Sequence, residues 1–290
     1  MITLSMTASV GVNAANKAVD VNLLKALLNA YARKYNLPIL SNNKVDEDFI
    51  ELVEHFQTNI VKIGRSDGIV FANKVTFKSL VNSLHSGYKK VSITNPENGV
   101  LTWEAEGTEG GRFHSRSFHV PSNNSGLTIG RGYDMKEKTA TQIKNHLILA
   151  GIEVMRADVI SLAAGKIGSM AKKFVIENDL LDFEISAQAQ LKLFEIIYKE
   201  LELDVKRICN KSKIVTDYGV TNWIALNSKI KAVIIDLRFR GDYHGSSRRF
   251  LQKHIASNDL VEFTKEIMNE ANWGAVPSSR RQARIKFIQS

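Results

Sequence analysis

The sequence predicts a mainly α-helical protein of the α+β class, with one small antiparallel hairpin among many helices. Apolar residues at positions 21, 24, 27, 28 and 31 recur at the spacing of one helix face. The stretch from Thr139 to Gln142 is typical of a helix N-terminus, because a Thr and a Gln at this spacing can each satisfy a free backbone N–H. Apolar and small residues alternate over 127–130, which indicates a short strand.

The first 90 residues form a helical segment of their own. The expected core positions of its second helix are Phe49, Leu52, Val53 and Phe56, and its third helix is expected to have Thr76 near its start and Leu80 in its core. Two helices, a Phe-Gln pair, an Asp-Gly-Ile-Val turn and a Thr-x-x-x-Leu helix together resemble the small three-helix peptidoglycan-binding module found on many wall hydrolases. A helical adaptor that docks a catalytic part or a delivery protein is the alternative.

The stretch 85–99 gathers Ser, Gly, Asn, Pro and Lys with little periodicity, so we expect one domain over 1–90 and a second over 91–290. In the second domain a short helix is expected to end at Gly107, and another is expected to follow Thr139 and run to Ala150. Further helices are expected at about 157–165, 168–177, 186–208, 221–226, 228–239, 247–255, 258–271 and 278–288.

Glu106 is a candidate general acid. It stands in the closing turn of the short helix that Gly107 ends. A carboxyl group there is near the negative end of the helix and often near buried apolar groups, and both disfavour its charged form.

Asp134 is the candidate base. Gly130 and Gly132 allow a sharp turn after the predicted strand, so Asp134 can return beside Thr128, which is expected to point outward from the strand. A protonated Glu facing an ionised Asp is what glycoside hydrolysis requires, since one group protonates the leaving oxygen and the other activates water.

Four segments in the same order resemble pesticin-type muramidases, a branch of the phage-lysozyme superfamily. The first holds a Glu-Gly pair, a Val-Pro pair and Ser-Gly-Leu-Thr-Ile-Gly-Arg-Gly-Tyr-Asp-Met at 125–135. The others are the helix beginning Ile-Ser-Ala-Gln at 185, the stretch from Ile234 to Gly241, and the Trp, Pro and Arg-x-x-Arg pattern between Trp273 and Arg284. The resemblance implies a lysozyme-like fold with a hairpin and a helical lobe.

The resemblance also implies site residues. Glu106 matches the general acid, Thr128 the threonine that helps hold the attacking water, and Asp134 the aspartate six residues further on. The ordinary phage pattern places its aspartate before the threonine, but residues 113–125 contain no Asp or Glu. Glu109, which also precedes a glycine, is the alternative to Glu106 as the acid.

Further residues are candidates for substrate binding. His114, Arg116 and His119 alternate along a presumed strand and could line a sugar groove, or be ordinary exposed strand residues. Arg281 and Arg284 could pair with acidic groups of the cleft, or lie on a solvated helix face. Tyr133, next to Asp134, completes this substrate-binding set. The histidines show no metal-ligand spacing, so neither a metal nor an organic cofactor is expected.

Composition limits the class of protein. The chain has 290 residues, of which 44% are hydrophobic, and can bury one sizeable core and a smaller one. Its formal charge of +9 implies attraction to polyanions, but no nucleic-acid-binding signature accompanies it, so nucleic acid is not expected as a partner. No apolar run is long enough for a membrane span. The single cysteine, Cys209, excludes an intramolecular disulfide and is interpreted as a small core residue.

The start of the chain lacks the basic and apolar regions of a secretory signal. We therefore expect synthesis in the cytoplasm and delivery to the periplasm or cell wall of a target cell, by holin-type release or by a device such as a type VI secretion machine. A secretion-apparatus protein and an immunity protein are the partners expected of an effector.

The expected function is a lysozyme-type glycoside hydrolase. It would cleave the β-1,4 bond between N-acetylmuramic acid and N-acetylglucosamine in peptidoglycan, as an antibacterial effector toxin or a phage-type lysin. We expect an inverting reaction, with the two carboxyl groups roughly 6.5–9.5 Å apart. A lytic transglycosylase, a non-catalytic wall-binding protein and a basic nucleic-acid binder are the alternatives.

Overall fold

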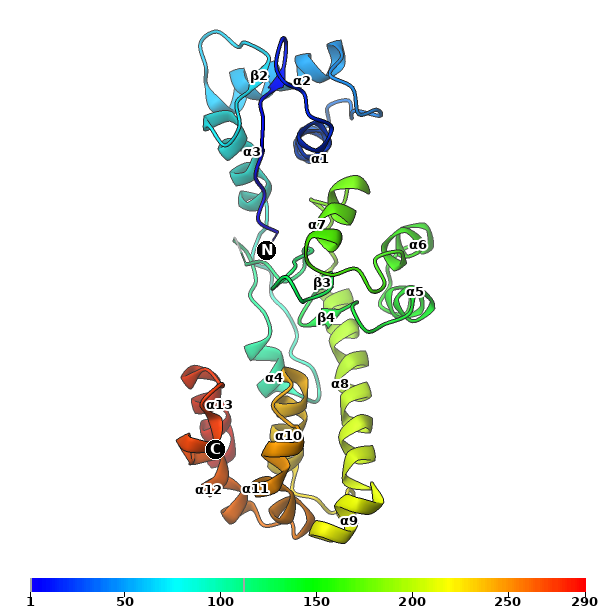
Figure 1. Ribbon diagram of the computed structural model, residues 1–290, viewed down its shortest axis with the longest axis vertical. Coiled ribbons are helices and arrows are strands. Elements are labelled where there is room, and N and C mark those ends of the chain that lie inside the picture. The colour runs from blue at the N-terminus through cyan, green and yellow to red at the C-terminus, as the bar shows by residue number, and fades with distance from the viewer. Residues whose placement is uncertain (1, 112) are drawn as a thin grey trace. The chain divides into compact units, whose positions relative to one another are not determined.

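The computed structural model describes residues 2–111 and 113–290 (Figure 1). These residues form thirteen α-helices and two two-stranded antiparallel sheets, which confirms the predicted mainly helical class. Contacts group the chain into two compact units. The first unit holds the chain up to Ile93 together with Thr108–Gln190, and the second holds Thr94–Gly107 together with Leu191–Ser290. The domain boundary at 90–91 stays a prediction.

The N-terminal part of the first unit contains the three expected helices. Its elements are β1 (Val10–Gly11), α1 (Ala18–Tyr35), α2 (Glu47–Phe56), the π-helical turn η1 (Gln57–Val61), β2 (Ile69–Val70) and α3 (Val75–Ser86). The predicted core face of α1 is confirmed, because residues 21, 24, 27, 28 and 31 are all buried. Those of α2 and α3 are confirmed too, since all five expected core positions are buried, and Thr76 is the second residue of α3. The small β1–β2 sheet was not expected.

The rest of the first unit contains the predicted hairpin and three more helices. Its elements are β3 (Thr128–Ile129), β4 (Tyr133–Asp134), α5 (Ala140–Leu149), α6 (Val154–Ser161) and α7 (Gly168–Glu177). The predicted cap of α5 is confirmed, because the Thr139 side chain accepts from Gln142 N and the Gln142 side chain accepts from Thr139 N. Arg33 of α1 pairs with Asp179 and Asp182, at 2.7 Å each, and so fixes α1 to the loop that follows α7.

The second unit is built around α10. Its elements are α4 (Val100–Ala105), most of α8 (Ala187–Cys209), α9 (Ser212–Tyr218), α10 (Ser228–Arg240), α11 (Gly245–Ala256), α12 (Leu260–Met268), the 3-10 turn η2 (Glu270–Trp273) and α13 (Ser278–Gln289). α10 packs against α4, α12 and α13 (Figure 1). It has buried residues on more than one face, and Gly241 in the left-handed conformation ends it.

Two expectations for the second unit are wrong. Residues 221–226 form turns instead of a helix. Thr221 and Leu226 are buried, but their spacing of five residues does not place them on one helix face, and Ile224 between them is 91% exposed. Conversely, α9 was not expected. None of its residues is buried, so the sequence there lacks the periodic apolar signal that identifies a helix.

Gln57 provides a test of the N-terminal fold. The Gln57 side chain is buried, donates to Asp67 Oδ1 and Ile69 O, and accepts from the N–H groups of Asp67 and Gly68. Gln57→Leu leaves these groups without their partner, so we expect the free energy of unfolding to fall by about 2 kcal/mol or more in urea titrations. Gln188→Leu, at an exposed position of α8, is the matched control. Equal losses in the two variants would contradict this account.

Candidate active site

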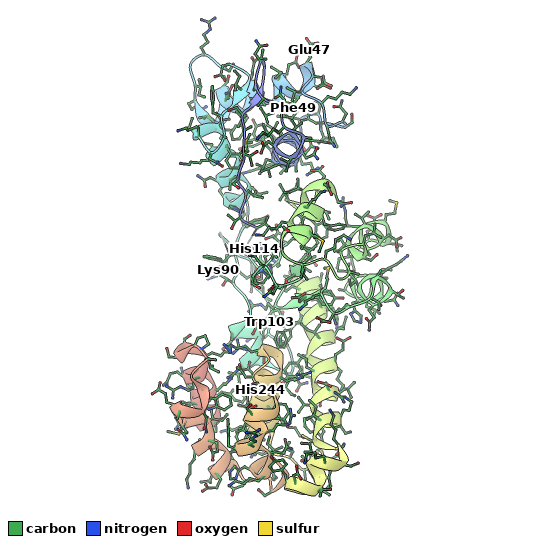
Figure 2. All side chains as sticks on the ribbon, viewed as in Figure 1. Glu47, Phe49, Lys90, Trp103, His114 and His244 are labelled. Atoms are coloured by element: carbon green, nitrogen blue, oxygen red, sulfur yellow. The ribbon has the colours of Figure 1, made fainter. Side chains whose placement is uncertain are left out.

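Glu106 lies at the end of α4 in the second unit. The buried face of α4 is Leu101, Thr102 and Trp103, and the Trp103 ring meets Phe194 edge-on at 5.1 Å (Trp103 is labelled in Figure 2). The helix ends at Glu106, whose N–H donates to Thr102 O at 3.0 Å. The predicted position of Glu106 at a helix terminus is thus confirmed.

Glu106 forms part of the wall of a cleft of about 810 Å³. The cleft belongs entirely to the second unit, since α4, α10 and α13 and the residues next to them supply its walls. Its lining residues are Val100, Leu101, Glu104, Ala105, Glu106, Arg240, Pro277, Ser279, Arg280, Ala283, Lys286, Phe287 and Ser290. The walls therefore combine apolar surface with groups of both charges.

Burial raises the pKa of Glu106 above the ordinary range of a glutamate. Arg280 opposes this effect, because its Nη1 lies 3.0 Å from Glu106 Oε1, and the negative charge of Asp236 reinforces it. The Glu106 side chain is 23% exposed, so it reaches the cleft although most of its surface is covered. A carboxylic acid that keeps its proton and faces a cleft is able to act as a general acid.

A buried ionic network lies behind Glu106. Asp236 of α10 has a fully buried side chain, and its Oδ1 accepts from Thr102 Oγ1 at 2.9 Å and from Arg280 Nη2. Its Oδ2 accepts from Arg280 Nε at 3.2 Å and from Arg284 Nε at 2.7 Å. Arg284 continues to Asp242, which also pairs with Arg240. Two buried or half-buried carboxylates, Asp236 and Asp242, and three guanidinium groups thus form one network, which contacts Glu106 through Arg280.

The structure shows the partners of Arg281 and Arg284 of α13, whereas the role of Arg281 in substrate binding stays a prediction. Arg284 is buried and belongs to this network, whereas Arg281 pairs with the exposed Glu270. The sequence analysis did not identify Asp236 and Arg280. Asp236 could have been found as a lone acid in the apolar run 233–237, and Arg280 as the residue one helical turn before Arg284.

Thr128 and Asp134 lie in the first unit and are directly opposite each other in the β3–β4 hairpin, as the turn prediction required. Thr128 does not point outward to solvent, because it is 3% exposed and its hydroxyl donates to Gly126 O at 3.3 Å. The backbone N–H and C=O of Thr128 both hydrogen-bond to the backbone of His119, and this neighbouring segment covers Thr128. The expectation of an outward Thr128 is therefore wrong.

The carboxylate of Asp134 is fixed by backbone donors. Oδ1 accepts from Lys136 N at 2.7 Å, and Oδ2 accepts from Gly126 N at 3.2 Å. A Cβ at residue 126 would collide with Asp134 Oδ1, so glycine is required there for this close approach. The pairing of Glu106 with Asp134, which belong to different units, stays a prediction.

The expected exposure of His114 and Arg116 is wrong, and the roles of His114, Arg116 and Tyr133 in substrate binding stay predictions. His114 is 3% exposed, accepts from Gly110 N at 2.9 Å and contacts Glu184 at 2.9 Å (His114 is labelled in Figure 2). Arg116 is buried, and Tyr133 is buried with its hydroxyl 3.0 Å from His146 Nδ1. The stretch 114–119 forms isolated β-bridges instead of a regular strand, because its polar groups hydrogen-bond mainly to nearby loops.

Glu109, the alternative acid, has a different environment from Glu106. Its Oε2 accepts from Arg116 Nε at 3.0 Å, and its Oε1 accepts from Gln190 Nε2 at 2.9 Å. Its side chain is only 7% exposed. Because both oxygens are held by donors within the first unit, Glu109 is less suited than Glu106 to deliver a proton to a ligand.

No helix among the described residues has both the length and the apolar character that crossing a membrane would require. Within residues 2–111 and 113–290, no group of three or more His, Cys, Asp or Glu side chains is arranged to hold a metal ion.

The raised pKa of Glu106 predicts how stability depends on pH. The unfolded chain releases this proton near the ordinary glutamate pKa, whereas the folded chain releases it at higher pH. The folded state therefore loses relative stability as pH rises through the interval between the two values. Glu106→Gln lacks this titration. The free energy of unfolding of the variant minus that of wild type should therefore increase across that interval, by about 1.4 kcal/mol for each tenfold difference between the acid constants of Glu106 in the unfolded and folded chain.

Urea unfolding of wild type and Glu106→Gln at a series of pH values measures this difference. Glu104→Gln, at an exposed position of α4, is the control and should show no such growth. A wild-type-to-variant difference for Glu106→Gln that stays constant between pH 4 and 8 would contradict the raised pKa.

Residues 99–285 match a family described as a domain of unknown function, DUF8812. The matched residues include Glu106, Thr128 and Asp134, as well as Asp236 and Arg280 of the network. No curated protein matches the chain. Because the match covers more than half of the sequence, the chain belongs to the DUF8812 family.

Proposed function

We propose that the chain is a peptidoglycan hydrolase with a lysozyme-like catalytic domain, and that it cleaves the β-1,4 bond between N-acetylmuramic acid and N-acetylglucosamine. The observation that best supports this proposal is Glu106, whose pKa is raised by burial while its side chain faces a cleft of about 810 Å³. Glycoside hydrolysis needs such an acid, because the leaving alkoxide is too basic to depart without a proton.

In the proposed reaction, Glu106 gives its proton to the glycosidic oxygen as the bond from that oxygen to the muramic acid anomeric carbon breaks. Positive charge develops on this carbon and its ring oxygen. A water molecule attacks the carbon from the opposite face and loses a proton to Asp134, and exchange with solvent restores both carboxyl groups. The products are a new reducing end with inverted configuration and a free hydroxyl group on the glucosamine.

The hairpin supports the role given to Asp134. Two backbone N–H groups fix its carboxylate, so the direction of the remaining lone pairs is fixed too, and Thr128 lies directly opposite it in the hairpin. A base that is held in this way loses little entropy when it orients a water. In this proposal Thr128 acts with Asp134 at the water, and Tyr133 contributes to substrate binding.

The lining of the cleft is compatible with a glycan. Sugar rings present apolar faces and a rim of hydroxyl groups, so they bind to surfaces that alternate apolar and polar groups. Leu101, Pro277 and Phe287 supply apolar surface, while Glu104 and Lys286 supply polar groups. The proposal includes delivery of the enzyme to the periplasm or wall of a target cell, as an effector toxin or a phage-type lysin.

Replacement of the acid tests the proposal directly. Glu106→Gln keeps the shape of the side chain but removes the transferable proton, so release of reducing ends from purified sacculi should fall by about 10²- to 10⁴-fold. Glu97→Gln changes an exposed glutamate of the same unit that is not among the cleft-lining residues, and this control should keep the activity. Wild-type activity in Glu106→Gln, together with loss in Glu109→Gln, would assign the acid to the alternative residue.

Asp134→Asn separates hydrolysis from lytic transglycosylation. A transglycosylase uses the muramic acid's own hydroxyl in place of water and needs no base at this position, whereas a hydrolase should lose about 10²-fold or more in rate. Mass analysis of the products distinguishes hydrated from anhydro-muramic ends, and circular dichroism verifies that the variant is folded. Near-wild-type lysis by Asp134→Asn with anhydro ends would overturn the hydrolase proposal.

A further inference from the structure

The buried Asp236 is the residue that the proposed reaction leaves without a role. Its side chain is fully buried on α10, among the buried apolar residues Ile234, Ile235 and Leu237. Removing a carboxylate from water costs several kcal/mol unless charged donors surround it. Here Thr102, Arg280 and Arg284 provide four hydrogen bonds. Apolar residues in place of the whole network could fill the same space without this cost, so a purely structural role does not require these charges.

Arg280 connects Asp236 to the proposed acid. Its Nε and Nη2 donate to Asp236, and its remaining terminal nitrogen, Nη1, lies 3.0 Å from Glu106 Oε1. One planar guanidinium group thus holds both carboxyl groups in fixed positions. The contact with Asp236 has two hydrogen bonds, and such bidentate pairs are the strongest kind that arginine forms.

A lone Arg280 would work against a general acid. A cation in contact with a carboxyl group favours the ionised form, and an ionised Glu106 has no proton to give. The negative charge of Asp236 offsets the positive charge of Arg280 next to Glu106, because Asp236 and Glu106 contact the same guanidinium group. Arg284, the second cation on Asp236, is in turn shared with Asp242.

We propose that Asp236 is a positioning residue that allows Arg280 to hold Glu106 in place while Glu106 stays protonated. This inference rests on the proposed role of Glu106 as the acid. Asp236 acts through Arg280 and touches no substrate. The electrostatic effect of Asp236 has the direction that this role requires. Burial has the largest effect and raises the pKa of Glu106, Arg280 lowers it, and the charge of Asp236 raises it.

Other charged groups near Glu106 come from the same three helices. They are Glu104 on α4, Arg240 on α10, and Arg280, Arg284 and Lys286 on α13. Arg240 lowers the pKa of Glu106 and is itself paired with Asp242 at 2.7 Å. Asp236 is the acidic group that contacts Arg280 together with Glu106.

The experiment follows the proton on Glu106 directly. Carboxyl ¹³C NMR titration of the full chain gives the pKa of Glu106, and Glu106→Gln identifies its resonance by loss of the signal. Asp236→Asn removes the buried negative charge, so the pKa of Glu106 should fall by about one pH unit or more. Arg284→Gln removes a positive charge and leaves Asp236 in excess, so the pKa should move upward. Asp217→Asn, at an ion pair on α9, is the matched control and should leave it unchanged.

Opposite shifts in the two variants are the decisive result, because a merely structural role would not reverse sign. Shifts in the same direction, or no shift, would overturn the inference. If Asp236→Asn fails to fold, as judged by circular dichroism, Arg284→Gln alone decides: an upward shift supports the inference and any other result rejects it.

Activity on sacculi separates this inference from the function. In an active enzyme, Asp236→Asn should move the alkaline limb of the pH–rate profile to lower pH by the same amount as the NMR titration. A wild-type protein that releases no reducing ends would refute the proposed hydrolase, but the opposite NMR shifts would still establish the control of Glu106 by Asp236.

Discussion

The second unit depends on the compensation of one buried negative charge. Asp236 brings together three helices that are far apart in the sequence, because Thr102 reaches it from α4 and Arg280 and Arg284 reach it from α13. Removal of Arg280 or Arg284 would take away part of the positive charge that compensates Asp236, which is more costly than exchange of the whole network for apolar residues. The position of Glu106, four residues after Thr102, follows from this arrangement.

The same compensation reconciles two conflicting demands on a general acid. Burial raises the pKa of Glu106, but a buried carboxyl group also needs a hydrogen-bonding partner, and the partner here is a cation. Because Asp236 shares Arg280 with Glu106, Arg280 fixes the position of Glu106 while its positive charge favours ionisation of Glu106 less strongly. Glu109 and Arg116 of the first unit illustrate a different arrangement, in which donors hold both oxygens of the acid.

Sequence patterns predicted the features that arise from local chemistry. The core face of α1, the cap at Thr139 and the return of Asp134 beside Thr128 each depend on residues within one element or turn. The Asp236 network escaped prediction because its partners are 44 to 134 positions away in the chain, where periodicity carries no information. The burial of His114 and Arg116 escaped for the same reason, since residues near 184 help to cover them.

The two carboxyl groups proposed for catalysis are supported in different ways, and the sequence reflects this. Asp134 is held by backbone N–H groups within a glycine-rich hairpin, so its surroundings are encoded by the spacing of a short segment. Glu106 is held by side chains from α4, α10 and α13, so its surroundings are encoded by charges placed throughout the second unit. A local motif can therefore identify the residue proposed as the base, whereas the protonation of the residue proposed as the acid follows only from the packed structure.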